Sequence, residues 1–166
     1  MNIFLIGGAP NTGKTNAVVW IANQLIVNGF TLKECINYSY KKIAIPKVAT
    51  KANSTKDFLA VFEGKNKNGK KINITIASAS DTKKIIDKNT SYLKNHPCDL
   101  YISSIRDINE EREFVLKQFR NEQIYEFPVA KVSRKEDNWF KSKDWYDESV
   151  HNILSLILRN PPFELF

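Results

Sequence analysis

Two hydrophobic patterns alternate along the chain: short continuous apolar runs, and apolar residues at helical spacing. The short runs predict six strands, over residues 2–7, 30–36, 58–62, 72–76, 100–105 and 124–129. The helical spacing predicts four helices, over residues 14–28, 81–93, 110–119 and from near Asp144 to Pro161 and Pro162. This alternation predicts a three-layer α/β/α fold with a mostly parallel central sheet, formed by a single domain over residues 1–166.

The spacing also predicts which helical side chains enter the core. The inward residues of the first helix are Ala17, Val18, Ile21 and Leu25, and Gly29 follows its end. The second helix is expected to use Ser80 or Asp81 as its N-cap and to have Ile85, Ile86 and Leu93 as core contacts. In the third helix the inward residues are Phe114, Val115 and Phe119. In the last helix the residues at helical spacing are Tyr146, Val150, Ile153, Leu154, Ile157 and Leu158.

Two of the expected strands, 58–62 and 72–76, flank a turn over residues 64–70 that contains Asn68-Gly69. This arrangement predicts a β-hairpin, with its second arm in the central sheet. The preceding stretch, residues 41–57, is basic and polar and contains Pro46, so we expect it to be an exposed excursion.

The segment Gly8-Ala9-Pro10-Asn11-Thr12-Gly13-Lys14-Thr15 joins the first strand to the first helix. Its spacing matches the Walker A pattern, which predicts a nucleotide-binding P-loop rather than a plain glycine-rich turn. Backbone N–H groups and the helix N-terminus would bind phosphate, Lys14 would bridge the β- and γ-phosphates, and the Thr15 hydroxyl would ligate Mg²⁺. The predicted nucleotide-binding residues are Gly8, Asn11, Thr12, Gly13, Lys14, Thr15 and Asn16.

Over residues 2–28 the chain resembles the P-loop NTPase superfamily. The resemblance implies an acidic residue at the end of a neighbouring strand, where it orients a metal-bound water. Asp81 and Asp107 are the candidates. Asp81 is favoured because the small residues before it would let the backbone pass close to the triphosphate, and it could also cap a helix. Asp107 lies directly at a strand end.

The stretch Ser103 to Glu110 resembles deoxynucleoside monophosphate kinases and the related P-loop phosphomevalonate kinases. In that family a strand leads into Asp-x-Arg, and Asn-Glu opens a helix. Arg106 corresponds to the arginine, and Asn109 and Glu110 to the Asn-Glu pair. Ser104 stands where the family has its aspartate, and no His- and Glu-bearing substrate loop follows the last strand. The resemblance covers residues 98–130 and leaves the acceptor open.

Arg106, at the carboxyl end of a strand, could hold an acceptor phosphate with its planar guanidinium. The alternative is a surface arginine paired with Asp107 or Glu110. The basic and aromatic segment 131–143 could be a lid that supplies Arg134 to the γ-phosphate, or a solvated loop held by Trp139. We assign no chemistry to His96 and His151.

The chain has 166 residues and a net charge of +7, an excess that suits phosphate-bearing partners, either nucleotides or nucleic acid. Cys35 and Cys98 are expected to be reduced core residues. No signal-peptide pattern opens the sequence, and the late run Ile153 to Leu158 is too short to cross a bilayer. These features predict a cytoplasmic protein.

The catalytic candidates are therefore Lys14, Asp81, Arg106 and Arg134, with Thr15 and Asp81 at the metal. The leading hypothesis is a small kinase that transfers the γ-phosphoryl group of Mg²⁺-bound ATP to a phosphorylated or hydroxyl-bearing acceptor. The alternatives are an NTPase that acts as a switch or motor for a partner, and a nucleic-acid-associated protein. ATP is favoured over GTP because no guanine-reading Asn-Lys-x-Asp segment is present.

Overall fold

A computed structural model of the chain describes residues 1–10, 12–47, 56–106, 110–130 and 139–166, with the side chains of the last range described from residue 144. The described residues form a mixed α/β structure with a six-stranded, mostly parallel sheet and four helices. In chain order these elements are β1 (Asn2–Gly7), α1 (Lys14–Val27), β2 (Thr31–Ile36), β3 (Leu59–Lys65), β4 (Lys71–Ala77), α2 (Lys83–Asn95), β5 (Leu100–Ile105), α3 (Glu110–Gln118), β6 (Gln123–Pro128) and α4 (Trp139–Arg159).

The strands of the sheet lie in the order β2-β3-β4-β5-β1-β6. The pairs β4–β5, β5–β1 and β1–β6 are parallel, whereas β3 runs antiparallel to both β2 and β4. The β3–β4 pair is the expected hairpin, and both of its arms belong to the sheet. Its turn is closed by Asn66 Oδ1, which accepts the backbone N–H groups of Asn68 and Lys70 at 3.1 and 2.9 Å. Gly69 has a φ of 78°, a left-handed conformation that favours glycine.

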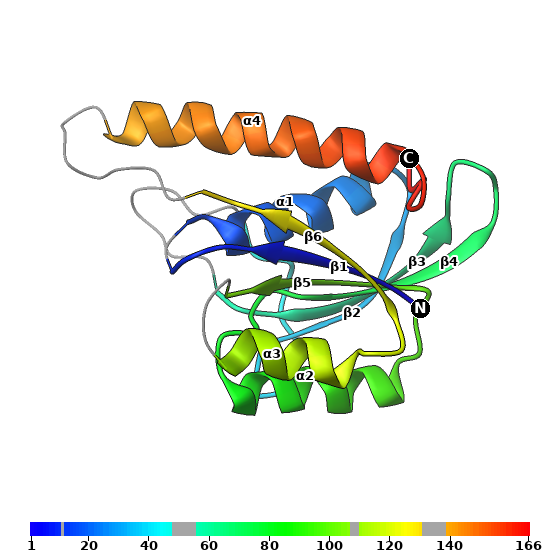
Figure 1. The fold of residues 1–166 in the computed structure, drawn as a ribbon. Helices are drawn as coiled ribbons and strands as arrows, with labels where there is room; N and C mark the ends of the chain where they lie inside the picture. The colour runs from blue at the N-terminus through cyan, green and yellow to red at the C-terminus, as the bar shows by residue number, and fades with distance from the viewer. Residues whose placement is uncertain (11, 48–55, 107–109, 131–138) are drawn as a thin grey trace.

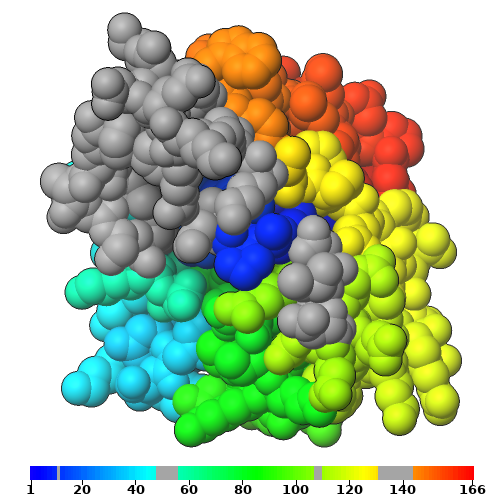
Figure 2. All heavy atoms as spheres, turned by 60° about the vertical axis from the view of Figure 1, so that its left-hand side comes forward, coloured from blue at the N-terminus to red at the C-terminus, as the bar shows by residue number. Residues whose placement is uncertain are grey.

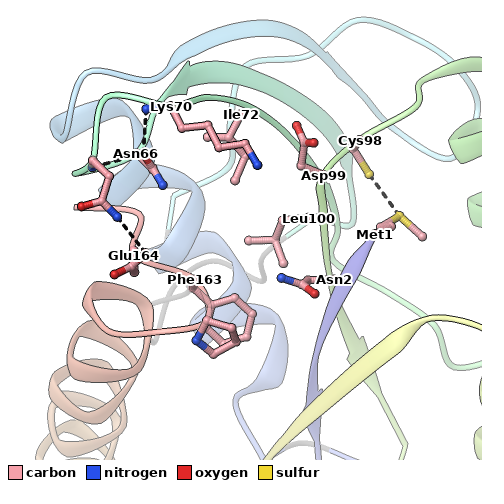
Figure 3. Close-up of a pocket in the computed structure, with 12 residues that line it drawn as sticks. Met1, Asn2, Asn66, Lys70, Ile72, Cys98, Asp99, Leu100, Phe163 and Glu164 are labelled. Carbon is pink, nitrogen blue, oxygen red and sulfur yellow. Dashed lines mark hydrogen bonds between the residues drawn. The ribbon is translucent and has the colours of Figure 1, made fainter.

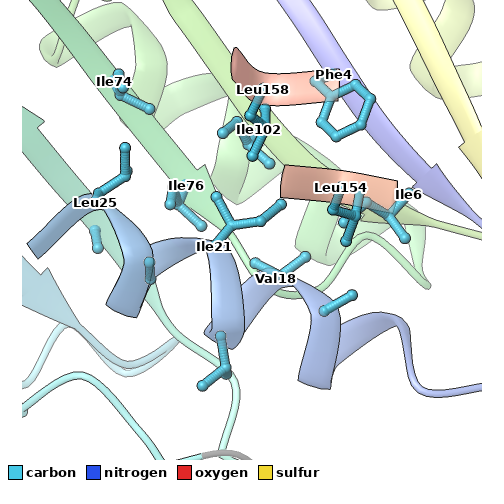
Figure 4. Close-up of a cluster of buried hydrophobic side chains, with 14 of the residues drawn as sticks. Phe4, Ile6, Val18, Ile21, Leu25, Ile74, Ile76, Ile102, Leu154 and Leu158 are labelled. Atoms are coloured by element: carbon cyan, nitrogen blue, oxygen red, sulfur yellow. The ribbon is translucent and has the colours of Figure 1, made fainter. Parts of the chain in front are cut away.

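The four helices are divided between the two faces of the sheet (Figure 1): α1 and α4 cover one face, and α2 and α3 cover the other. Each face has its own apolar core. Val18, Ile21 and Leu25 of α1 are fully buried, which confirms the inward face expected for this helix. They point toward the apolar side chains of the sheet, and α4 adds Leu154 and Leu158 to the same cluster (Figure 4).

Three expectations about the helices were wrong in detail. α2 begins after Thr82, not after Ser80 or Asp81, because Thr82 Oγ1 accepts the Ile85 N–H at 3.3 Å. α4 begins at Trp139, five residues before the expected start near Asp144. Ile153 is 46% exposed while Leu154 is fully buried, because position 153 lies at the edge of the buried stripe of α4.

Both cysteines are free, as expected, but only Cys35 is a core residue, and Cys98 is half-buried. Burial raises the pKa of the Cys35 thiol to about 11. None of the described helices combines the length and the apolar composition that crossing a membrane requires.

The packing of α4 predicts a contrast between two leucines of the same helix. Leu154→Ala removes a fully buried side chain and should lower the free energy of unfolding by about 2–5 kcal/mol in urea denaturation. Leu156→Ala is the matched control, because Leu156 is 64% exposed and its loss should change the free energy by less than about 0.5 kcal/mol. Equal effects of the two substitutions would contradict this placement of the helix.

Candidate functional site

The predicted P-loop begins where the interior strand β1 ends, at the carboxyl edge of the sheet. β1 has parallel neighbours on both sides, and Gly7 pairs with Ile105 of β5 and Pro128 of β6. The Gly8 N–H donates to the Ile105 carbonyl at 3.2 Å, and the Val129 N–H donates to the Gly7 carbonyl at 2.7 Å. The first residues of the loop are therefore held by both neighbouring strands.

Two glycines of the loop occupy positions that a larger residue would disturb. A Cβ atom on Gly8 would lie 2.6 Å from the Val129 carbonyl oxygen and 2.9 Å from Thr12 Oγ1. Gly13, the N-cap of α1, has a φ of 90°, in the left-handed region. The glycines that the Walker A pattern requires thus coincide with a close backbone approach and a left-handed turn.

The N-terminus of α1 carries no compensating negative group. No side chain caps this helix, and its first turn contains no acidic residue. In contrast, Thr82 caps α2, and the first turn of α3 contains Glu110, Glu111 and Glu113. The N-terminus of a helix attracts anions, so α1 presents an anion-binding end at this edge. In Figure 2, the blue atoms of the first part of the chain reach the surface in the middle of this face.

The polar side chains of the loop differ in their contacts. Lys14 Nζ donates to the carbonyl oxygens of Gly8 and Ala9 at 2.6 and 2.7 Å, and Thr12 Oγ1 donates to the same Ala9 carbonyl at 2.9 Å. Thr15 Oγ1 forms no hydrogen bond with any residue that the structure describes. Asn16 is buried, and Asn11 lies outside the described residues. Lys14 therefore places its positive charge against the loop itself.

Asp81 and Arg106 meet beside the loop. β5 lies between β1 and β4, so Arg106, just after β5, is placed between the predicted P-loop and the segment after β4 that carries Asp81. Arg106 Nη2 lies 3.3 Å from Asp81 Oδ2. Asp81 Oδ1 is buried and has no hydrogen-bond partner among the described residues. An acidic oxygen and a guanidinium group are thus brought together at the edge where the loop begins.

Other sequence candidates are not joined to this pair. The alternative that Arg106 pairs with Glu110 was wrong, because Glu110 forms its ion pair with Lys83 at 2.9 Å. Asp107, Asn109 and Arg134 lie outside the described residues.

A buried hydrogen-bond network behind Asp81 was not expected from the sequence. Asn89 of α2 is 2% exposed, and its Nδ2 donates to the Ala79 carbonyl at 2.8 Å and to Ser80 Oγ at 3.0 Å. The Tyr38 hydroxyl lies 2.9 Å from the same carbonyl and 3.0 Å from Asn89 Oδ1. Burial raises the pKa of Tyr38, so this hydroxyl keeps its proton. Side chains from two distant segments therefore hold the backbone just before Asp81.

The serines near Asp81 join this segment to β5. Ser104 Oγ donates to the Ser78 carbonyl at 2.7 Å, and the hydroxyls of Ser80 and Ser103 lie 2.8 Å apart. We expected the small residues before Asp81 to let the backbone approach a triphosphate. In the structure, Ser78 and Ser80 are buried and their hydroxyl groups bond to neighbouring protein groups, while the approach to a triphosphate stays a prediction.

Asp57 is a second carboxylate at this edge that the sequence reasoning missed. Ser78 Oγ donates to Asp57 Oδ1 at 3.3 Å. Burial, and to a smaller extent the charge of Asp81, raises the pKa of Asp57. Because β3 runs antiparallel to β4, the start of β3 lies at the edge where β4 ends. The predicted hairpin was the signal that could have placed Asp57 here.

The residues predicted to hold magnesium have suitable chemistry. Mg²⁺ prefers oxygen ligands and often takes only one or two from the protein, with water and phosphate oxygens completing its shell. The Thr15 hydroxyl and the unpartnered Asp81 Oδ1 are oxygens of this kind. Within the described parts of the chain, no three His, Cys, Asp or Glu side chains are grouped to hold a metal ion.

The chain was compared with known protein families, with curated proteins and with solved structures. None of the three comparisons found a match.

Proposed function

We propose that this chain binds ATP and Mg²⁺ at residues 8–16 and catalyses phosphoryl transfer as a small nucleotide-kinase-like phosphotransferase of the P-loop NTPase fold. The observation that carries the proposal is the uncapped N-terminus of α1, which follows a Walker A loop anchored between two parallel strands. A helix end of this kind, with glycine-lined backbone and a lysine, is suited to a polyphosphate. We place this activity in the cytoplasm.

Lys14 is the residue of the loop with the clearest expected role. Its ammonium group is bonded to two loop carbonyls, at a point where a β- or γ-phosphate oxygen would be a stronger partner than a neutral carbonyl. We infer that Lys14 moves from these carbonyls to the phosphates when the nucleotide binds. This exchange would let one positive charge stabilise both the empty and the loaded loop.

Arg106 supports transfer chemistry in addition to nucleotide binding. Phosphoryl transfer depends on positioning and on positive charge around the transferred group more than on a covalent partner. Arg106 follows the strand next to β1, and its contact with Asp81 is a single 3.3 Å hydrogen bond with the side chain one-third exposed. Its remaining donors could hold an acceptor phosphate. Arg134 is proposed as a second cation on the lid, at a position outside the described residues.

Thr15 and Asp81 are the proposed magnesium residues. When bound, Mg²⁺ would neutralise the developing charge on the phosphate oxygens. Thr15 Oγ1 would contribute a direct ligand, and Asp81 would hold a metal-bound water through its unpartnered Oδ1. The network of Tyr38, Asn89 and the serines would fix the direction of this carboxylate, because a ligand held by second-layer hydrogen bonds loses little freedom on binding.

An ATP hydrolase that acts on a protein or nucleic-acid partner is the second candidate. The antiparallel β3–β4 hairpin before Asp81 supports it, because GTPases have a similar antiparallel strand before their metal-binding acid. The net charge of +7 supports a nucleic-acid partner in particular.

Labelled ATP distinguishes the two candidates. The protein is incubated with ATP labelled at the γ-phosphate, with Mg²⁺, and with a panel of nucleoside monophosphates and phosphorylated small molecules. Transfer of label to a panel member supports the kinase. The hydrolase is supported if phosphate is released at a rate that no panel member changes, or if DNA or RNA stimulates this release. The proposal is contradicted if the protein neither binds nor turns over the nucleotide.

Lys14→Ala should weaken ATP binding by about 10- to 100-fold in calorimetry, since a hydrogen bond to a charged group contributes about 1.5–3 kcal/mol. Lys65→Ala removes an exposed lysine from the hairpin and should leave the affinity unchanged. If Lys14→Ala binds ATP as the unmodified protein does, the loop is not the nucleotide site.

Asp81→Asn should raise the Mg²⁺ concentration for half-maximal activity by about tenfold, equivalent to about 1.4 kcal/mol. ATP affinity measured in EDTA should not fall, because the carboxylate acts through the metal. Asp87→Asn, an exposed position on α2, is the control. An unchanged Mg²⁺ requirement in Asp81→Asn would exclude Asp81 from the metal shell.

Asn89→Leu should raise the same Mg²⁺ requirement by about tenfold. Metal sites commonly lose 10- to 100-fold in affinity when a residue that hydrogen-bonds to the metal ligand, or supports it, is removed. It should also lower the free energy of unfolding by about 1–3 kcal/mol, since it leaves the Ala79 carbonyl and Ser80 with fewer partners. Activity is compared at a temperature where the variant is fully folded, with Asn95→Leu as control. A purely structural role would change the unfolding energy and leave the Mg²⁺ requirement unaltered.

A further inference from the structure

A cavity lies at the opposite edge of the sheet from the predicted P-loop, where β1 and β5 begin. Its volume is about 450 Å³, within the range of small-molecule sites. Its walls come from three parts of the chain: the hairpin turn with Asn66 and Lys70, the strand starts with Asn2, Asp99 and Leu100, and the C-terminal segment with Phe163 and Glu164. Figure 3 shows these side chains around the cavity.

The two outer walls of this cavity are joined by direct contacts. The Lys67 N–H donates to the Glu164 carbonyl at 3.0 Å, Asn68 Nδ2 donates to Glu164 Oε2 at 2.8 Å, and Lys67 Nζ donates to the Arg159 carbonyl at 2.7 Å. Glu164 has a φ of 49°, a left-handed conformation that costs a non-glycine residue about 1 kcal/mol or more. These bonds join the hairpin turn to the C-terminal segment and so connect two walls of the cavity.

Among the charged residues that line the cavity, Glu164 pairs with Lys67 and the Met1 ammonium group pairs with Glu122, whereas Lys70 and Asp99 form no ion pair with each other. In Figure 3 the Lys70 side chain extends from the hairpin toward the strand start that carries Asp99. The described chain nevertheless contains no ion pair or hydrogen bond between them. Asp99 Oδ2 accepts the Asn73 N–H at 2.9 Å, which fixes the carboxylate, and Lys70 has no side-chain partner among the described residues. The Asn2 side chain likewise lines the cavity without a hydrogen bond to described residues.

The floor beneath these charges is apolar. Leu100 and Phe163 are buried and line the cavity together with Ile72, which is half-buried. Lys70 and Asp99 are both exposed, so a ligand can reach either charge. A ligand that carries a cation, an anion and an apolar body can contact both charges and the apolar floor at once, whereas a ligand with a single charge can pair with only one of them.

We propose that this cavity binds a free α-amino acid with an apolar side chain. The α-ammonium group pairs with Asp99, the α-carboxylate pairs with Lys70 and the Asn2 amide, and the side chain rests on Leu100 and Phe163. An α-amino acid carries both charges on one carbon together with an apolar side chain, so one small ligand offers a partner to Asp99, to Lys70 and to the apolar floor. This site is separate from the proposed nucleotide site and does not depend on it.

The test uses the nucleotide-free protein, with L-leucine, L-methionine and L-phenylalanine as probes in calorimetry and in amide NMR titration. We expect binding of at least one probe, with the largest shifts at Asn2, Asn66 and Lys70. The N-acetyl derivative of that probe lacks the cation and its amide derivative lacks the anion, so both should bind at least about fivefold more weakly.

Two variants test the charges separately. Lys70→Met keeps the aliphatic stem, and Asp99→Asn keeps the oxygen that accepts the Asn73 N–H, so both should remain folded. Each variant should lower the affinity for the probe by at least about fivefold. Lys65→Met, on the same hairpin but outside the cavity, should leave this affinity unchanged. The proposal is overturned if no probe binds at millimolar concentration, if shifts map elsewhere, if the derivatives bind equally well, or if all three variants bind alike.

Discussion

The pairing of β1 with parallel neighbours on both sides is the constraint on which the rest of the site depends. Because β5 and β6 run in the same direction as β1, the chain leaves all three strands at one edge, and the backbone at Gly7 and Gly8 is bonded to both neighbours. The loop has little freedom at its start, since the Val129 carbonyl and Thr12 fill the space where a Cβ atom on Gly8 would lie. α1 can then present its N-terminus in only one direction.

Polar side chains are buried directly behind the carboxyl edge of the sheet. Serine hydroxyls and the Asn89 amide are deep in the structure between β4, β5 and α2, where an unsatisfied polar group costs about 1–3 kcal/mol. Apolar residues at these positions would pack without that risk. The network instead ties the carbonyls of residues 78 and 79 to fixed donors, which restricts the segment before Asp81. Such restriction is what a carboxylate needs if it is to hold one direction at a solvent-facing site.

The sequence predicted the features that are determined by residues close together in the chain. The glycine that follows α1, the Asn-Gly turn of the hairpin and the apolar stripe of α1 each depend on residues within a few positions of one another, and these expectations were confirmed. The P-loop was also predicted from local spacing. The structure shows the left-handed Gly13 and the close backbone approach at Gly8, while the P-loop assignment and nucleotide binding stay predictions.

The contacts that sequence reasoning missed join distant segments. Tyr38 reaches Asn89 across 51 positions, and Asp57 reaches Ser78 across 21. No periodicity marks such residues in advance, because their partners are set by strand order. The N-cap of α2 was misplaced for the same reason: Ser80 and Asp81 resemble good caps, but contacts with β5 and Arg106 occupy their side chains.

The strand order also sets the sequence of events during synthesis. β1 precedes both of its partner strands in the chain, and Asn2 pairs with Leu100 on one side and with Gln123 on the other. The hairpin and β2 can pair among themselves earlier, because their contacts are closer in sequence. The nascent chain must therefore carry an unpaired apolar strand, Ile3 to Ile6, until β5 and β6 have been made.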